Sequence, residues 1–138
     1  QWLSEKARVF AFPYDRQLAQ IHLTGKMLED NLGSIDWLES FGWEYSYRES
    51  RLVRDSDGLP IHENSFVADF EEGTAAIIVR VQEDRTLYKK NREVCDKQSR
   101  RSTADFRYTF KREGSEWKIS GFCRIDQYEK CVPDDKGC

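Results

Sequence analysis

The side chains that could perform acid–base chemistry are few, and each also fits a structural role. His22 follows two aliphatic residues on one face of a predicted helix, where an imidazole could act as a base or simply form a hydrogen bond in the core. His62 lies in a polar stretch. Asp15 and Asp36 each stand at a predicted helix start, where a carboxylate accepts backbone N–H groups. With no nucleophile–base motif and no glycine-rich phosphate loop, the sequence predicts no catalytic residue and no cofactor.

The four cysteines, Cys95, Cys123, Cys131 and Cys138, lack the spacing of a zinc site, so no metal is predicted. Cys131 and Cys138 bracket a turn-rich spacer, and a disulfide between them would close a small loop in an oxidising compartment. The alternative is a tail with free thiols. Cys123 lies in phase with apolar residues of a predicted strand, which predicts a buried free thiol.

Aromatic residues alternate with polar ones in two stretches, 43–48 and 104–111. Such stripes are typical of a core, but tyrosines at the edge of a groove could also bind a partner, because the ring adds apolar area and the hydroxyl meets a peptide backbone. Arg80 and Arg107 lie on the opposite phase and could meet an acidic or terminal carboxylate, or solvent. The residues predicted to bind a partner are Trp43, Tyr45, Tyr47, Arg80, Phe106 and Tyr108, with Phe110 on the same stripe.

Residues 85–101 are locally basic and are predicted to form a loop. Beside a membrane, each basic residue would add about 1 kcal/mol of attraction to anionic head groups. The alternative is an exposed, mobile loop. The residues predicted to contact a membrane surface or an acidic partner are Lys89, Lys90, Arg92, Arg100 and Arg101.

The order of the predicted elements is helices first and strands after. A 3.6-residue apolar period predicts four short helices before Gly42, with breaks at Pro13, Gly25 and Gly33. From Trp43 onward the period changes to two, which predicts an antiparallel meander. The predicted fold is therefore α+β, with N-terminal helices packed on a strongly curved antiparallel sheet in a cone shape.

Composition limits the classes of function. The chain has 138 residues, of which 34% are charged, and its net charge of −3 argues against a nucleic-acid binder. No apolar run is long enough to span a membrane. The first residue is Gln1, which indicates a fragment or a processed product, so a targeting peptide or anchor outside this chain is compatible with the sequence.

Short motifs in a fixed order resemble the IMS-type domain of plastid-division proteins and their cyanobacterial relatives, which is similar to nuclear-transport-factor-two-like cones. The motifs are Trp2-Leu3 with Lys6, Phe12-Pro13-Tyr14-Asp15-Arg16, Leu23-Thr24-Gly25, Gly33-Ser34-Ile35-Asp36-Trp37-Leu38, Glu83-Asp84-Arg85-Thr86-Leu87-Tyr88, Tyr108 and Trp117-Lys118-Ile119. Residues 57–64 and the tail beyond Gln127 depart from the family. We therefore expect an IMS-like domain over residues 1–127 and a tail over residues 128–138.

The resemblance implies a noncatalytic domain that binds another, membrane-associated protein on its curved sheet, at a plastid envelope or thylakoid or at a cyanobacterial membrane. In the plastid-division members the domain follows a membrane helix and captures the tail of a partner membrane protein. Two alternatives stay open: a small-molecule enzyme or carrier that uses the hollow of the cone, and a structural or assembly subunit of a photosynthetic complex.

Overall fold

The computed structural model describes residues 1–132 and contains three α-helices, a short 3₁₀ helix and five strands. The helices precede the strands, as the sequence predicts. The bounds are α1 Trp2–Val9, α2 Arg16–His22, α3 Gly25–Phe41, β1 Glu44–Leu52, η1 Glu63–Ser65, β2 Val67–Asp69, β3 Thr74–Tyr88, β4 Val94–Glu113 and β5 Glu116–Arg124.

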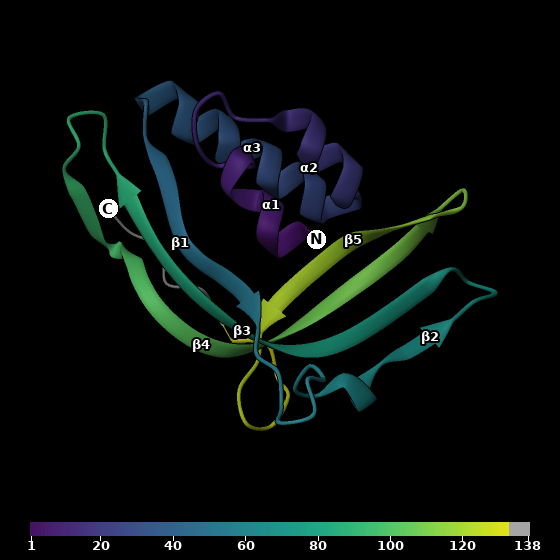
Figure 1. Ribbon diagram of the computed structural model, residues 1–138. Coiled ribbons are helices and arrows are strands. Elements are labelled where there is room, and N and C mark those ends of the chain that lie inside the picture. Colours follow the sequence, from purple (N-terminus) through teal and green to yellow (C-terminus); the bar gives the residue numbers. More distant parts are fainter. Residues whose placement is uncertain (133–138) are drawn as a thin grey trace.

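The strands form one open antiparallel sheet in the order β1-β3-β4-β5. The short β2 pairs with the first residues of β3 and β1 with the last, so both lie along the same edge of β3. The sheet curves strongly, and the helices lie over its concave face (Figure 1). Helices over an antiparallel sheet confirm the predicted α+β class.

The start of α2 agrees with the sequence. The Asp15 carboxylate accepts the backbone N–H of Leu18 at 3.1 Å, so this residue is the predicted cap. The helix ends before Leu23, and Thr24 N–H donates to the carbonyl of Ile119 on β5, which holds the helices against the sheet.

The predicted break at Gly33 is wrong, because α3 is one helix of 17 residues. The Ser34 hydroxyl bonds to the Asp30 carbonyl inside the helix and caps nothing. Asp36 lies in mid-helix and pairs with Arg16 at 2.8 Å. Buried Met27, Ile35 and Leu38 continue one apolar face through the glycine, and this packing outweighs the low helix propensity of glycine.

The predicted basic loop over residues 85–101 is also wrong. β3 continues to Tyr88 and β4 begins at Val94, so the basic residues lie on a long hairpin with a short turn between its strands. Lys89, Lys90 and Arg92 occupy the turn, whereas Arg100 and Arg101 lie on β4. The sequence did not predict this hairpin because charged residues interrupt the apolar alternation at the ends of both strands.

One core fills the space between the helices and the concave face. Its fully buried members come from both layers and include Val9, Leu23, Ile35, Leu38, Leu87 and Cys95. Partly buried aromatic residues of the sheet, Tyr45 and Tyr47 among them, pack at its edge. Side chains do not fill all of the space between the helices and the sheet, and a groove remains there.

Candidate partner-binding groove

A groove with a volume of about 1060 Å³ lies between the helices and the sheet. Helices α1 and α3 form one wall and the concave face of the sheet forms the other. Residues that line it include Trp2, Lys6 and Met27 on the helices and Tyr45, Tyr47, Arg85, Tyr108 and Phe122 on the strands. Gly33 of α3 lies on the same wall, with no atom within 4 Å of the position where a Cβ would sit.

Three tyrosines predicted from the aromatic stripes meet in this groove. Tyr45 and Tyr47 come from β1 and Tyr108 from β4, with β3 between the two strands. Phe122 of β5 stacks on Tyr108 with ring centroids 5.6 Å apart. Burial, and to a lesser extent the Glu83 carboxylate, raises the pKa of both Tyr47 and Tyr108, so these phenols stay neutral and can act as hydrogen-bond donors.

An ionic cluster lies behind the tyrosines. Lys6 forms an ion pair with Glu83, and the two side chains are 13% and 16% exposed. Ser50 donates to the same Glu83 oxygen at 3.0 Å. Burial lowers the pKa of Lys6, while the Glu83 carboxylate opposes the shift.

Arg85 is the second cation of this cluster. Its Nη1 lies 3.8 Å from Glu83 Oε1, and its Nε is buried without a hydrogen-bond partner. The guanidinium lies over the Tyr45 ring at 5.0 Å, as the Lys6 ammonium lies over Tyr47. The groove wall is therefore both aromatic and cationic.

The other residues predicted to bind a partner do not line the groove. Trp43 packs against Trp37 at 5.1 Å, with Lys89 over its ring. Phe106 lies on the concave face and packs beside Phe122 at 5.8 Å. Arg80 binds Asp105 through two hydrogen bonds of 2.9 and 3.3 Å on the other face of the sheet, and that face cannot reach the groove.

The basic residues are spread over two places. Arg92 pairs with Glu44 at 3.0 Å and lies over Tyr88, and Lys90 packs against Gly42. Lys89, Lys90 and Arg92 border a smaller cleft of about 460 Å³, next to the exposed Phe12. Arg101 is exposed on β4, and Arg100 is half-buried there.

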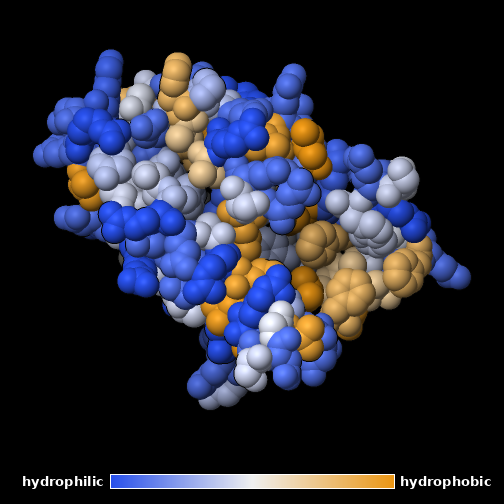
Figure 2. Space-filling view, viewed as in Figure 1, coloured by the Kyte–Doolittle hydropathy of each residue, from blue (hydrophilic) through white to orange (hydrophobic). Residues whose placement is uncertain are grey.

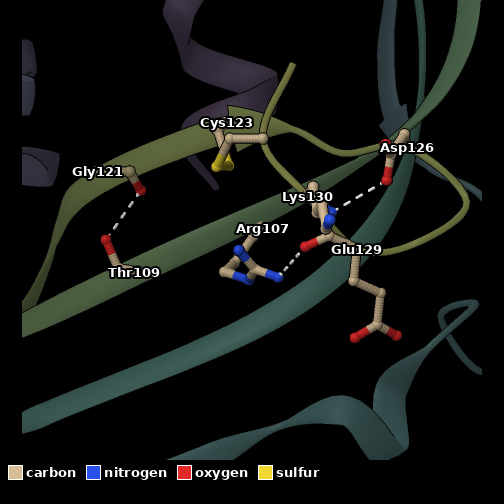
Figure 3. The surroundings of a disulfide bond; sticks show 8 residues. Arg107, Thr109, Gly121, Cys123, Asp126, Glu129 and Lys130 are labelled. Carbon is tan, nitrogen blue, oxygen red and sulfur yellow. Dashed lines mark hydrogen bonds between the residues drawn. A yellow bond between two sulfur atoms is a disulfide. The ribbon is translucent and has the colours of Figure 1, made fainter.

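Cys131 is in a disulfide, as predicted, but its partner is Cys123 and not Cys138, with Cα atoms 5.5 Å apart. The prediction of a free thiol at Cys123 is therefore wrong. The chain turns back after β5: Asp126 accepts the Lys130 N–H, Arg107 donates to the Glu129 carbonyl, and Cys131 is brought beside the strand (Figure 3). No pattern in the sequence analysis predicted this turn. Cys138 lies outside the described residues.

The histidines lie away from the groove tyrosines and do not form a catalytic group with them. His22 Nε2 lies 2.5 Å from Glu5, between α1 and α2, and His62 lies 3.2 Å from Asp105 on the other face of the sheet. Within residues 1–132, no group of three or more His, Cys, Asp or Glu side chains could hold a metal ion. In the same range, no helix has the length and apolar character needed to cross a membrane.

Sequence reasoning missed the charged part of the groove. Lys6 lies one helical turn from Trp2 and so shares its face, and Glu83 and Arg85 continue the alternation of Val79 and Val81. Charged residues at positions that share a face with apolar residues could have indicated this cluster. A second apolar area, also missed, lies over the strands around β2 (Figure 2). Phe66 and Phe70 are exposed, and Phe70 packs against Trp117.

The chain matches a known protein family. The family model described as ARC6-like, IMS domain, matches residues 1–120. The crystal structure of the intermembrane space region of the chloroplast protein ARC6 matches with a TM-score of 0.62 and 16% identity, covering 89% of this chain and 87% of that one. No curated protein sequence matches the chain. At this identity, the structural match shows a shared fold.

Proposed function

Because the chain belongs to the ARC6-like IMS domain family, we propose that it is a noncatalytic domain that binds a segment of another protein in the groove between its helices and its curved sheet. By analogy with the ARC6 region, the domain would work at a plastid envelope, in the intermembrane space, in a protein of plastid division. Its outline would be the cone of nuclear-transport-factor-two-like domains, and the domain would end near residue 127.

The observation that carries the proposal is the meeting of Tyr45, Tyr47 and Tyr108 in one open groove. Tyrosine is enriched at positions that dominate protein–protein binding, because a rigid ring is buried while its hydroxyl bonds to the partner. The volume of the groove is large enough to hold several side chains of an extended segment. The basic turn at Lys89, Lys90 and Arg92 would add contact with an acidic partner or an anionic membrane surface.

A photo-crosslinking experiment tests the proposal. A photoreactive amino acid replaces Phe122 in the groove, and in a control chain it replaces Val67, which is 63% exposed on β2 outside the groove. Both chains are incubated with plastid envelope extract and irradiated. We expect one protein, identified by mass spectrometry, to be attached at position 122 and not at 67. If position 122 yields no adduct above the control, the proposal fails.

The ionic cluster favours a second candidate, a carrier of a small molecule. A buried Lys6–Glu83 pair beside a large groove is an arrangement also found in ligand-binding pockets. Native mass spectrometry of the chain purified from its natural source would reveal a bound small molecule. A mass equal to that of the chain alone would reject this candidate.

A further inference from the structure

The exposed apolar side chains around β2 take no part in the proposed function, because none of them lines the groove. Phe66 and Phe70 flank the strand and Val67 begins it, with exposed fractions of 53%, 67% and 63%. Phe70 packs against Trp117 near the start of β5, with ring centroids 6.2 Å apart. These four residues form the β2 surface (Figure 2). A contiguous exposed apolar area of this kind is typical of an interaction site.

Strand β2 also has an unpaired edge. Its three residues pair with residues 74–76 of β3, and in the described part of the chain no other strand pairs with β2. The strand lies at the rim of the sheet, and all three of its residues are exposed (Figure 1). The backbone groups that point away from β3 can therefore bond to an added strand, whose side chains would pack beside Phe66 and Phe70.

Two turns give the β2 surface an acidic border. Arg112 donates to the Phe70 carbonyl at 3.0 Å, which holds the turn after β2 beside the turn between β4 and β5. The acidic side chains at these two turns are Asp69, Glu71, Glu72, Glu113 and Glu116. Glu113 pairs with Lys118 at 3.3 Å, but no cation among residues 1–132 forms an ion pair with Glu71, Glu72 or Glu116. The border thus has negative charge available for a partner.

This charge determines which kind of partner fits the β2 surface. A second copy of the chain, joined by two-fold symmetry, would bring the same carboxylates together. Nucleic acid and an anionic membrane would be repelled for the same reason. The groove wall carries the cations Lys6 and Arg85, so the groove and the β2 surface favour ligands of opposite charge.

We propose that the β2 surface binds an extended, basic segment of a second partner protein. The segment pairs with the outer edge of β2, packs apolar side chains on Phe66 and Phe70, and places lysine or arginine side chains beside Glu71 and Glu72. This inference goes beyond the proposed function, because it does not depend on the groove. A photoreactive residue at position 67 should accordingly capture a protein different from the one attached at position 122.

The test uses the 138-residue chain and a peptide of about ten residues in which lysine alternates with valine. One control peptide has glutamate in place of every lysine. A second keeps every lysine but has proline at its two central valines, because proline cannot donate a hydrogen bond to a strand. Dissociation constants are measured by fluorescence anisotropy. We expect both controls to bind at least about tenfold more weakly than the lysine–valine peptide, and added salt to weaken that peptide.

Nuclear magnetic resonance locates the bound peptide without any substitution in the chain. Backbone amide signals of residues 67–69 should shift on addition of the lysine–valine peptide, whereas those of Tyr45 and Tyr47 in the groove should not. Shifts confined to the groove would overturn the inference.

A charge-removing variant tests the acidic border. Glu71→Gln combined with Glu72→Gln should weaken binding of the lysine–valine peptide about fivefold. Asp36→Asn combined with Glu93→Gln is the matched control, because it removes the same charge from exposed positions on α3 and on the turn between β3 and β4. The control variant should bind as the unaltered chain does.

The outcomes separate this inference from the proposed function. Equal binding of the lysine and glutamate peptides would overturn the basic character of the ligand, and undiminished binding of the proline peptide would overturn strand pairing. Both comparisons use the unaltered chain, so they stand even if a variant unfolds. The groove is tested by crosslinking at position 122, and failure of either experiment leaves the other conclusion in place.

Discussion

The ammonium of Lys6 on α1 and the carboxylate of Glu83 on β3 form an ion pair across the interface between helix and sheet, with little exposure of either side chain. The pair joins two segments that lie far apart in the sequence. It also places both charges at the groove, so the same contact bears on the stability of the fold and on the chemistry of the site.

Replacement of Glu83 should destabilise the domain more than replacement of Lys6. Glu83→Leu leaves Lys6 and Arg85 without their anion, and we expect a loss of about 3 kcal/mol in the free energy of unfolding. Lys6→Met leaves Glu83 with Ser50 and Arg85 and should cost less. Urea denaturation followed by circular dichroism measures both. The reverse ranking would show that Arg85 does not depend on Glu83.

The two aspartates predicted as helix caps should behave differently. Asp15→Ala removes the acceptor of the Leu18 N–H and should lower the free energy of unfolding by about 1 kcal/mol. Asp36→Ala removes an exposed ion pair with Arg16 in mid-helix and should cost well under 1 kcal/mol. Thermal unfolding of the two variants makes the comparison. Equal losses would contradict the assignment of Asp15 as the cap.

The contact between Glu5 and His22 should make stability depend on acid pH. Hydrogen bonds from His22, and then from Gln1, hold the pKa of Glu5 below its ordinary value. A lowered pKa stabilises the fold above the pKa of the unfolded chain, about 4.3, and this stabilisation is lost as the pH falls through the folded value. Urea denaturation of Glu5→Gln between pH 7 and pH 3 should therefore show a weaker loss of stability than the unaltered chain.

Glu29→Gln is the matched control for this prediction, since Glu29 is exposed on α3. It should keep the acid dependence of the unaltered chain. If Glu5→Gln and Glu29→Gln give the same curve, the contact with His22 contributes nothing to the acid dependence.

Removal of the Cys123–Cys131 disulfide should destabilise the domain. The bond spans a sequence separation of 8, and a loop of this size predicts a loss of about 2–3 kcal/mol by the chain-entropy model. The variant replaces both cysteines with serine, so that neither thiol is left free, and is compared with the unaltered chain by urea denaturation without reductant. An unchanged midpoint would mean that the turn at residues 126–130 holds Cys131 in place by itself.

The sequence predicted the fold class and the three groove tyrosines because their phase on each strand is local information. Tyr45 and Tyr47 face the helices as their alternation requires, and Tyr108 does the same from β4. The pairing of strands is not local. Nothing within either aromatic stretch identifies its neighbouring strand: β1 pairs with β3, so β3 lies between Tyr45 and Tyr108.

The charged cluster was missed for a related reason. Lys6 and Glu83 become partners only when α1 packs on the sheet, and no pattern within either segment identifies the other. The helix α3 was wrongly divided because glycine propensity is a weak local preference, whereas the burial of Ile35 and Leu38 depends on the whole fold. Arg80 was grouped with the groove residues, but it pairs with Asp105 on a neighbouring strand, and this pairing is not visible in the sequence around Arg80.

Gly33 reveals a trade-off between the stability of this domain and access to its groove. A glycine inside a helix costs about 1 kcal/mol relative to alanine, and α3 has open space at the position of the missing side chain. Gly33→Ala should therefore raise the melting temperature while weakening crosslinking at position 122, whereas Ser34→Ala should leave crosslinking unchanged. Unchanged crosslinking in Gly33→Ala would remove the reason for this glycine. Weaker crosslinking in Gly33→Ala would show that the absence of a side chain at this point of α3 lets the main chain of a ligand approach the helix. The lower stability of the helix would then be the cost of that access.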